Sequence, residues 1–148
     1  PRSTLFPYTT LFRSGTIESL YEANMDMLDD PNYLSLNVSK HLPVYSKSLN
    51  YPPHVVLDDG EIKGSVVADG SSIDGVVIRS TIGYRVQVRK NARVENCVVF
   101  SNVVVGEGAR IKNAIVNKDV VIPEGTVFEP EHVAILDQTT FAKGGAKR

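Results

Sequence analysis

Two arginines, Arg93 and Arg110, lie 17 residues apart in segments that resemble each other. Guanidinium groups bind phosphate through paired, charge-assisted hydrogen bonds. Two residues after each arginine comes another charged residue, Glu95 in the first segment and Lys112 in the second. If the two segments lie side by side, the arginines form a two-rung ladder that could grip a phosphate. The alternative is a pair of solvated surface rungs, whose ion pairs contribute only about 0–1 kcal/mol.

Neither the cysteine nor the acidic residues predict a disulfide, a metal site or a catalytic site in this chain. Cys97 is the sole cysteine, which excludes an internal disulfide. It occupies the repeat position that Ser65, Ser80 and Ala114 fill in other segments, so we expect a small, buried and inert side chain. No cluster of Cys, His and Asp has the spacing of metal ligands, and neither a nucleophile elbow nor a phosphate loop is present.

The aliphatic residues between Val88 and Ile122 recur in steps of six, five and six residues. This period of 17 residues is neither the 3.6 of a helix nor the 2.0 of a flat strand. One inward aliphatic residue on each of three faces per coil produces such a rhythm, which predicts a three-sided parallel β-helix. The residues in register are Val88, Val105 and Ile122, then Val94 and Ile111, then Val99 and Val116.

The repeat also extends toward the N-terminus. Val77–Ile82 matches Val94–Val99, and Ile62–Val67 matches again after a connection two residues shorter. We therefore predict a solenoid of about four coils over residues 55–128. A β-sandwich of short strands is the alternative, but sandwich strands do not hold a register of this length.

Turn residues repeat along with the aliphatic ones. Asn96 and Asn113 precede the small residue of their segments, where asparagine can satisfy backbone groups along a stack. Gly106, Gly108 and Gly125 recur where a turn is expected to need a positive φ. We assign all five to structure rather than to a binding site.

Composition and charge narrow the functional classes. The chain has 148 residues, 42% of them hydrophobic, and no apolar run approaches a membrane span. A net charge of −1 points to no nucleic-acid partner. Residues 61–128 hold nine basic and seven acidic residues, so the solenoid could bind a phosphorylated small molecule or be simply solvated. The lone cysteine and the lack of a secretory signal predict a cytoplasmic protein.

The segments outside the solenoid divide into three. Residues 1–14 resemble a translated sequencing adapter, so we leave them out of the fold and expect the natural chain to continue upstream of Gly15. Residues 15–54 are predicted to form a helix over 16–29 and then a connector along a surface. The apolar face of this helix needs a partner, which an upstream domain could supply. Residues 129–148 are predicted to be a tail.

Several segments resemble glucose-1-phosphate adenylyltransferases (ADP-glucose pyrophosphorylases). Gly15–Leu28 resembles the segment that leaves the catalytic domain in that family. Leu42–Ser46 resembles its Trp-Pro-Ile-Tyr-Thr, with leucine in place of tryptophan. Ala68–Val77 is similar to its first solenoid turns, and Ala114–Gly125 is similar to its closing turn, usually Ala-Ile-Ile-Asp-Arg-x-x-x-Ile-Pro-x-Gly.

The resemblance implies a left-handed β-helix that follows an α/β nucleotidyltransferase domain. That family joins ATP and α-glucose 1-phosphate to give ADP-glucose and pyrophosphate, for glycogen or starch synthesis. Its phosphate loop and its Mg²⁺ ligands lie upstream, and one ligand aspartate aligns with Arg13. The resemblance therefore implies no catalytic or metal-binding residue in this chain, which we expect to be inactive alone. Mg²⁺ and ATP would belong to the parent enzyme.

The resemblance also implies a regulatory role. Lys118 aligns with the basic residue of the closing turn, which in bacterial members contributes to a sugar-bisphosphate effector site. A lysine suits phosphate as a flexible point charge; the alternative is a solvated turn lysine. Lys118, Arg110 and Arg93 are the candidate effector-binding residues. The implied partners are the upstream nucleotidyltransferase domain and the other subunits of a homo- or hetero-tetramer.

Two other functions remain as alternatives. A non-catalytic regulatory subunit of the same family would keep the helix and the solenoid. A hexapeptide acyltransferase would place a histidine on a coil or its loop as general base. His41, His54 and His132 all lie outside the repeat, which argues against the acyltransferase.

Overall fold

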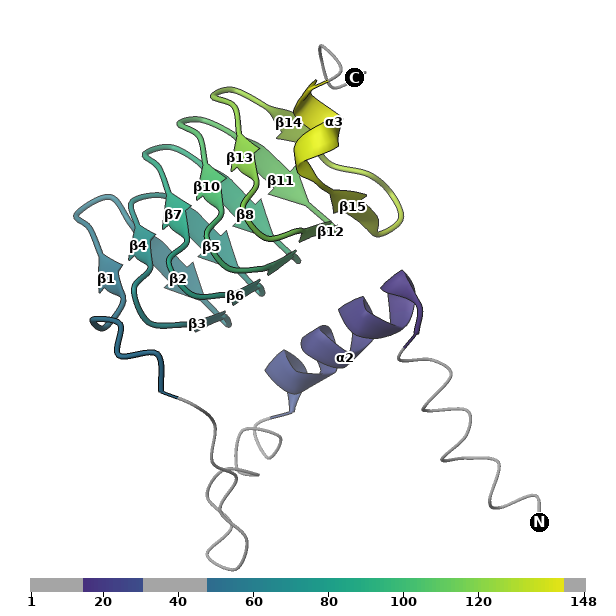
Figure 1. Cartoon of the computed structure of the whole chain (residues 1–148), viewed down its shortest axis with the longest axis horizontal. Coiled ribbons are helices and arrows are strands. Elements are labelled where there is room, and N and C mark those ends of the chain that lie inside the picture. The colour runs from purple at the N-terminus through teal and green to yellow at the C-terminus, as the bar shows by residue number, and fades with distance from the viewer. Residues whose placement is uncertain (1–14, 31–47, 143–148) are drawn as a thin grey trace, which may run out of the picture.

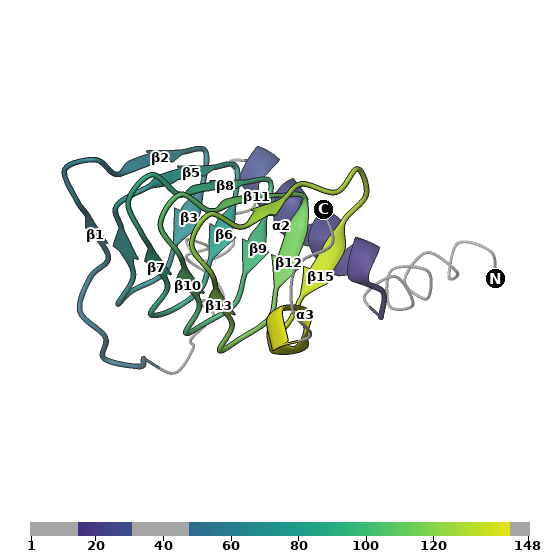
Figure 2. The same cartoon turned by 90° about the horizontal axis from the view of Figure 1, so that it is seen from above.

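The computed structural model describes residues 15–30 and 48–142. Within them, short strands wind into five coils, and each coil contributes one strand to each of three parallel sheets (Figure 1). Figure 2, seen from above, shows the coils following one another from left to right, from β1 to β15. The predicted β-helix is confirmed. The adapter-like residues 1–14, most of the connector (31–47) and the end of the tail (143–148) lie outside the described residues.

The three sheets have the same number of strands. Sheet A comprises β1 (Val55–Val56), β4 (Ser72–Ile73), β7 (Gln87–Val88), β10 (Val104–Val105) and β13 (Val121–Ile122). Sheet B comprises β2 (Glu61–Lys63), β5 (Val76–Ile78), β8 (Arg93–Glu95), β11 (Arg110–Lys112) and β14 (Val127–Phe128). Sheet C comprises β3 (Val66–Val67), β6 (Thr81–Ile82), β9 (Val98–Val99), β12 (Ala114–Val116) and β15 (Ala134–Leu136).

Residues that are 17 apart in the sequence pair with each other in neighbouring strands of one sheet. Val88 pairs with Val105, and Val105 with Ile122, in sheet A. Val94 and Ile111 pair in the same way in sheet B, and both are fully buried. The inward aliphatic residues of all three sheets form one continuous core along the axis. Each coil thus buries its apolar side chains against the coils before and after it, as a solenoid requires.

The solenoid has five coils, where the sequence predicted about four. β15 pairs with β12 at a spacing of 20 residues, with Ala134 opposite Ala114. These three extra residues break the period, so the sequence alone predicts β15 to be part of the tail, and the structure corrects this. The short helix α3 (Gln138–Ala142) follows, and Phe141 packs against the core of the solenoid.

Positive φ angles recur at the corners and account for most of the repeated turn residues. Asn96 and Asn113 have φ of 49° and 51°, and Gly108 and Gly125 both have φ of 67°. Asparagine and glycine tolerate this left-handed region best, so their structural assignment is confirmed. Gly106 differs, because its φ is not positive. A Cβ there would lie 2.6 Å from the backbone nitrogen of Glu124, so close packing between coils demands the glycine.

Helix α2 (Ile17–Asp29) confirms the predicted helix, with Thr16 as its N-cap. The Thr16 hydroxyl accepts a hydrogen bond from the Ser19 N–H at 3.1 Å. Figures 1 and 2 both place α2 alongside sheet C. Met25 forms a separate apolar cluster there with Val98 and Ile115, all three less than 5% exposed. The apolar face of this helix therefore packs on the solenoid, and not only on an upstream domain as the sequence suggested.

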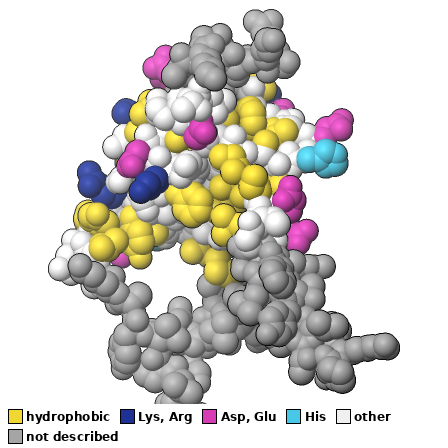
Figure 3. Space-filling view, turned by 45° about the vertical axis from the view of Figure 1, so that its right-hand side comes forward, with side chains coloured by type: hydrophobic (Ala, Val, Ile, Leu, Met, Phe, Trp, Pro, Cys, Tyr) yellow, Lys and Arg dark blue, Asp and Glu magenta, His cyan; other side chains and the backbone are white. Residues whose placement is uncertain are grey.

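Some apolar side chains remain at the surface after these elements have packed. The space-filling view in Figure 3 shows hydrophobic side chains gathered on one face, with basic and acidic side chains around them. The exposed apolar side chains of the described residues include Phe100, which is 38% exposed, and Val121, which is 52% exposed. Neither α2 nor α3 is long and apolar enough to cross a membrane.

Candidate phosphate site

Lys118 lies in the turn between β12 and β13, at the corner where sheet C passes into sheet A. The Asn117 side-chain oxygen accepts a hydrogen bond from the Lys118 N–H at 2.8 Å and so fixes the turn. A hollow of about 310 Å³ opens there, lined by Phe100, Ser101, Asn117 and Lys118. Within the described residues, the Lys118 ammonium group has no ion pair, so its charge is available to a ligand.

The side chains around the hollow suit binding rather than catalysis. They offer one ammonium group, one hydroxyl, one amide and the exposed ring of Phe100. The ammonium and the amide can donate to a phosphate, while the ring offers apolar contact to the rest of a small ligand. Among the residues that the structure describes, no carboxylate or imidazole lines the hollow.

Phe100 and Ser101 were missed by the sequence reasoning. They precede Asn117 and Lys118 by 17 residues, so they occupy the same turn one coil earlier. The repeat itself was therefore the signal that could have found them. It places equivalent turn residues of successive coils beside each other at one corner.

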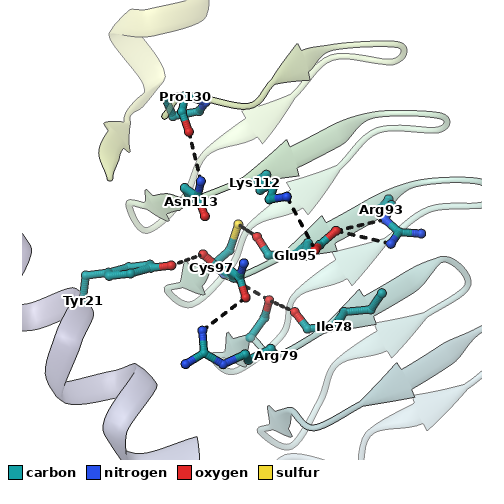
Figure 4. A network of polar contacts seen from close by, with 11 residues as sticks. Tyr21, Ile78, Arg79, Arg93, Glu95, Cys97, Lys112, Asn113 and Pro130 are labelled. Atoms are coloured by element: carbon teal, nitrogen blue, oxygen red, sulfur yellow. Dashed lines mark hydrogen bonds and ion pairs between the residues drawn. The ribbon is translucent and has the colours of Figure 1, made fainter. Parts of the chain in front are cut away.

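The arginine ladder forms as predicted, but on another side of the prism. Arg93 and Arg110 pair in register across β8 and β11, as do Glu95 and Lys112. Glu95 receives both an Arg93 nitrogen at 3.3 Å and the Lys112 ammonium at 3.7 Å. Figure 4 shows this three-residue group on the outer face of sheet B. Arg93 thus engages a carboxylate of its own chain.

The three candidate residues do not meet in one site. Lys118 occupies the corner between sheets C and A, whereas Arg93 and Arg110 lie on sheet B. In a three-sided prism that corner is the one opposite sheet B. A single phosphate on one chain therefore cannot contact all three, and only Lys118 lies in the hollow.

A polar network joins α2 to the corner between sheets B and C (Figure 4). The Tyr21 hydroxyl donates to the Asn96 carbonyl at 2.9 Å, and the Arg79 Nε donates to the Asp29 carboxylate at 3.1 Å. The hydrogen bond from Arg79 lowers the pKa of Asp29, and burial raises the pKa of Tyr21. These contacts fix α2 on sheet C rather than build a reactive centre.

Cys97 is part of a buried hydrogen-bond relay between coils. The Ser80 hydroxyl donates to the Ile78 carbonyl at 2.7 Å and accepts the Cys97 N–H at 3.1 Å. The Cys97 thiol donates to the Glu95 carbonyl at 3.1 Å, in the place of the serine hydroxyl one coil earlier. Burial raises the pKa of the Cys97 thiol to about 12. The predicted burial of this side chain is confirmed.

We expect the Cys97 thiol to resist a disulfide reagent such as dithiobisnitrobenzoate in the folded chain at pH 8. The thiolate is the nucleophile, and a pKa of about 12 leaves only about one thiol in ten thousand ionised at that pH. Adding guanidinium chloride should release about one equivalent of the coloured thiolate within minutes. Rapid reaction of the folded chain would contradict the buried position.

The described residues hold no group of three His, Cys, Asp or Glu side chains that could bind a metal ion. His54 and His132 are exposed, and neither lines the Lys118 hollow. His41 lies outside the described residues.

Comparison with known proteins identifies the relatives of this architecture. The family model for the GlmU-like C-terminal hexapeptide matches residues 52–143. A glucose-1-phosphate adenylyltransferase of Bacillus licheniformis is 38% identical over 94 residues, which is 63% of this chain and 24% of that protein. The Clostridioides difficile enzyme of the same name is 34% identical over 100 residues, 67% of this chain and 26% of that protein.

The matched region is the C-terminal part of these relatives, and the chain spans about a quarter of their length. The resemblance first seen in the helix segment and in the closing turn is thereby confirmed. The chain therefore belongs to the GlmU-like C-terminal hexapeptide family and is homologous to the C-terminal part of glucose-1-phosphate adenylyltransferases.

Proposed function

We propose that this chain is the C-terminal regulatory and assembly domain of a bacterial glucose-1-phosphate adenylyltransferase subunit. The observation that carries the proposal is the identity of 34–38% with the C-terminal quarter of enzymes of that name. The parent would join ATP and glucose 1-phosphate for glycogen synthesis in the cytoplasm, as a homo- or hetero-tetramer. Its catalytic residues, Mg²⁺ and ATP would belong to an upstream nucleotidyltransferase domain.

Helix α2 supports a mechanical link between such a domain and the solenoid. It resembles the segment that leaves the catalytic domain in the family, and it is fixed to sheet C by the cluster around Met25. The Arg79–Asp29 ion pair fixes its far end. A helix anchored along its length can transmit a small displacement of the solenoid to a domain that precedes it. Ligand binding to the solenoid would then couple to activity through two packed arrangements of this contact.

The Lys118 hollow is the proposed effector site. Its one ammonium group and its exposed aromatic ring fit a small phosphorylated sugar, with phosphate on Lys118 and the carbon skeleton against Phe100. Arg93 and Arg110 are not part of this site on the same chain, because they lie on sheet B. They remain candidates only for a second contact, made from another subunit.

The test is Lys118→Ala in the full-length parent, assayed with fructose 1,6-bisphosphate and other phosphorylated sugars. A lost charge-assisted hydrogen bond contributes about 1.5–3 kcal/mol, so the activator concentration for half-maximal activation should rise at least about tenfold. Activity without activator should not change. Lys112→Ala is the matched control, because it removes a lysine that pairs with Glu95 on another side of the prism. Unchanged activation in Lys118→Ala would refute the effector site.

A second assay separates the parent's activity from that of this chain. We expect the pure 148-residue chain to form no ADP-glucose from ATP, Mg²⁺ and glucose 1-phosphate, whereas the full-length parent forms it. A parent that is inactive alone, but alters the activator response of a catalytic subunit, would be the non-catalytic regulatory subunit instead. Turnover of acetyl-CoA by the chain would identify an acyltransferase.

A further inference from the structure

One corner of the solenoid carries a residue type that its backbone disfavours. At the corner between sheets B and C, successive coils place Gly64, Arg79, Asn96 and Asn113 in equivalent positions, with φ of 52°, 43°, 49° and 51°. Glycine and asparagine tolerate this left-handed region best, whereas a long side chain such as arginine is strained there. The strain at Arg79 must therefore be offset by what its side chain contacts.

Arg79 contacts the C-terminal end of α2. Its Nε donates to the Asp29 carboxylate at 3.1 Å, and its Nη1 donates to the Asn96 side-chain oxygen at 3.5 Å. The last turn of α2 contains Asp26 and Asp29 but no basic residue. Carboxylates at this end oppose the helix dipole, which favours positive charge there. The solenoid thus supplies, through Arg79, the positive charge that the end of α2 lacks.

A second feature acts against the docking of α2. The helix packs on β6, where Thr81 points outward beside Val98 of the next strand. Among the described residues, the Thr81 hydroxyl oxygen is the only buried side-chain polar atom without a hydrogen-bond partner. Water can hydrogen-bond to this hydroxyl once α2 has left, so its burial without a partner lowers the stability of the docked state.

We infer that α2 is a releasable element, which Arg79 holds on sheet C and which the buried Thr81 hydroxyl helps to release. The apolar cluster of Met25 is separate from the main core, so α2 can leave while the solenoid stays folded. The released α2 loses Arg79 at its acidic end and should lose helix as well. This released state is the second arrangement that the proposed mechanical link requires. For that role alone, the inference rests on the proposed function.

Arg79 should therefore affect the two units in opposite directions. Arg79→Asn removes the ion pair with Asp29, but it places at the corner a residue that tolerates the left-handed backbone. Hydrogen exchange of the complete 148-residue chain would measure both units at once. Protection of the α2 amides should fall at least about threefold, while protection of the strand amides should not fall.

Two further variants separate the ion pair from other effects. Asp29→Asn removes the same ion pair from the helix side, and it also removes a carboxylate that opposes the helix dipole. A loss of α2 protection, expected to be at least about twofold, is then due to the lost contact with Arg79. Arg85→Asn is the matched control, because Arg85 is also an arginine in the left-handed region, with φ of 56°, but contacts Tyr51 instead. Its α2 protection should stay within about twofold of the original.

Thr81→Val tests the opposing contribution. Valine has nearly the same shape as threonine but no hydroxyl, so it leaves no polar atom without a partner beneath α2. Protection of the α2 amides should therefore rise at least about fivefold in this variant.

The original chain provides the last comparison. Its α2 amides should exchange at least about tenfold faster than the amides of the core strands. Equal protection of helix and strands would mean that α2 leaves only when the whole solenoid unfolds, and this would overturn the inference. Unchanged α2 protection in Arg79→Asn, or no gain in Thr81→Val, would overturn it as well. None of these measurements depends on Lys118 or on ADP-glucose synthesis, so the proposed function is tested separately.

Discussion

Ile111→Ala is expected to lower the free energy of unfolding by about 2–5 kcal/mol, the usual cost of truncating a buried isoleucine. Ile111 points inward from β11 in the fourth coil and is 1% exposed. It belongs to the continuous core, with coils on both sides, so little can move in to fill the cavity. Because neighbouring coils stabilise each other, the loss should weaken the whole solenoid. The melting temperature should fall by about 10 °C or more.

Ile135→Ala is the matched control for this change. Ile135 also lies in a strand that pairs with the fourth coil, but its side chain points outward and is 42% exposed. The substitution removes the same three carbons, but from a side chain that is partly exposed to water in the folded chain. The free energy of unfolding should therefore fall by less than about 1 kcal/mol. Differential scanning calorimetry on both variants would compare them directly. Equal losses would mean that the inward and outward assignments are wrong.

These burial assignments show why most of the fold was predictable. An inward aliphatic residue on each face of each coil is a local requirement, so it is written into the sequence with a fixed period. Only the last strand of the fifth coil, β15, was not predicted, because three additional residues before Ala134 break that period. The packing of α2 on sheet C could not be predicted for a different reason. Val98 and Ile115 point outward, and a sequence does not reveal whether an outward aliphatic residue meets water or a helix.

The candidate site was predictable only in part, for a similar reason. Lys118 was identified from the resemblance of the closing turn, and the repeat would have added Phe100 and Ser101. The repeat also placed Arg93 beside Arg110, correctly. Lys118, Arg93 and Arg110 form one candidate group in the sequence only because all three are basic. Their charge does not indicate which side of the prism each side chain occupies. Whether a turn is recessed depends on the sizes of side chains in neighbouring coils, which no single motif contains.

Met25→Ala is expected to release α2 from sheet C without melting the solenoid. Met25 is 4% exposed and packs on Val98 and Ile115 in a cluster separate from the main core. Truncating a buried methionine costs about 2–5 kcal/mol, and here the loss concerns only the contact between helix and sheet. Units with separate cores open separately. Hydrogen exchange should therefore show protection of the α2 amides falling at least about thirtyfold, while the strands keep theirs.

Met27→Ala is the control that makes this result specific. Met27 lies on the same helix and is only half-buried, outside the Met25 cluster. Both changes replace methionine with alanine and alter helix propensity equally, so propensity cancels in the comparison. Met27→Ala should keep the α2 amides protected to within about threefold. If both variants lose protection equally, the helix is held by its length and its Arg79–Asp29 ion pair instead, and the same experiment on Asp29→Asn would then show the larger loss. If neither loses protection, α2 does not depend on sheet C for its stability, and a regulatory link through this contact would have no physical basis.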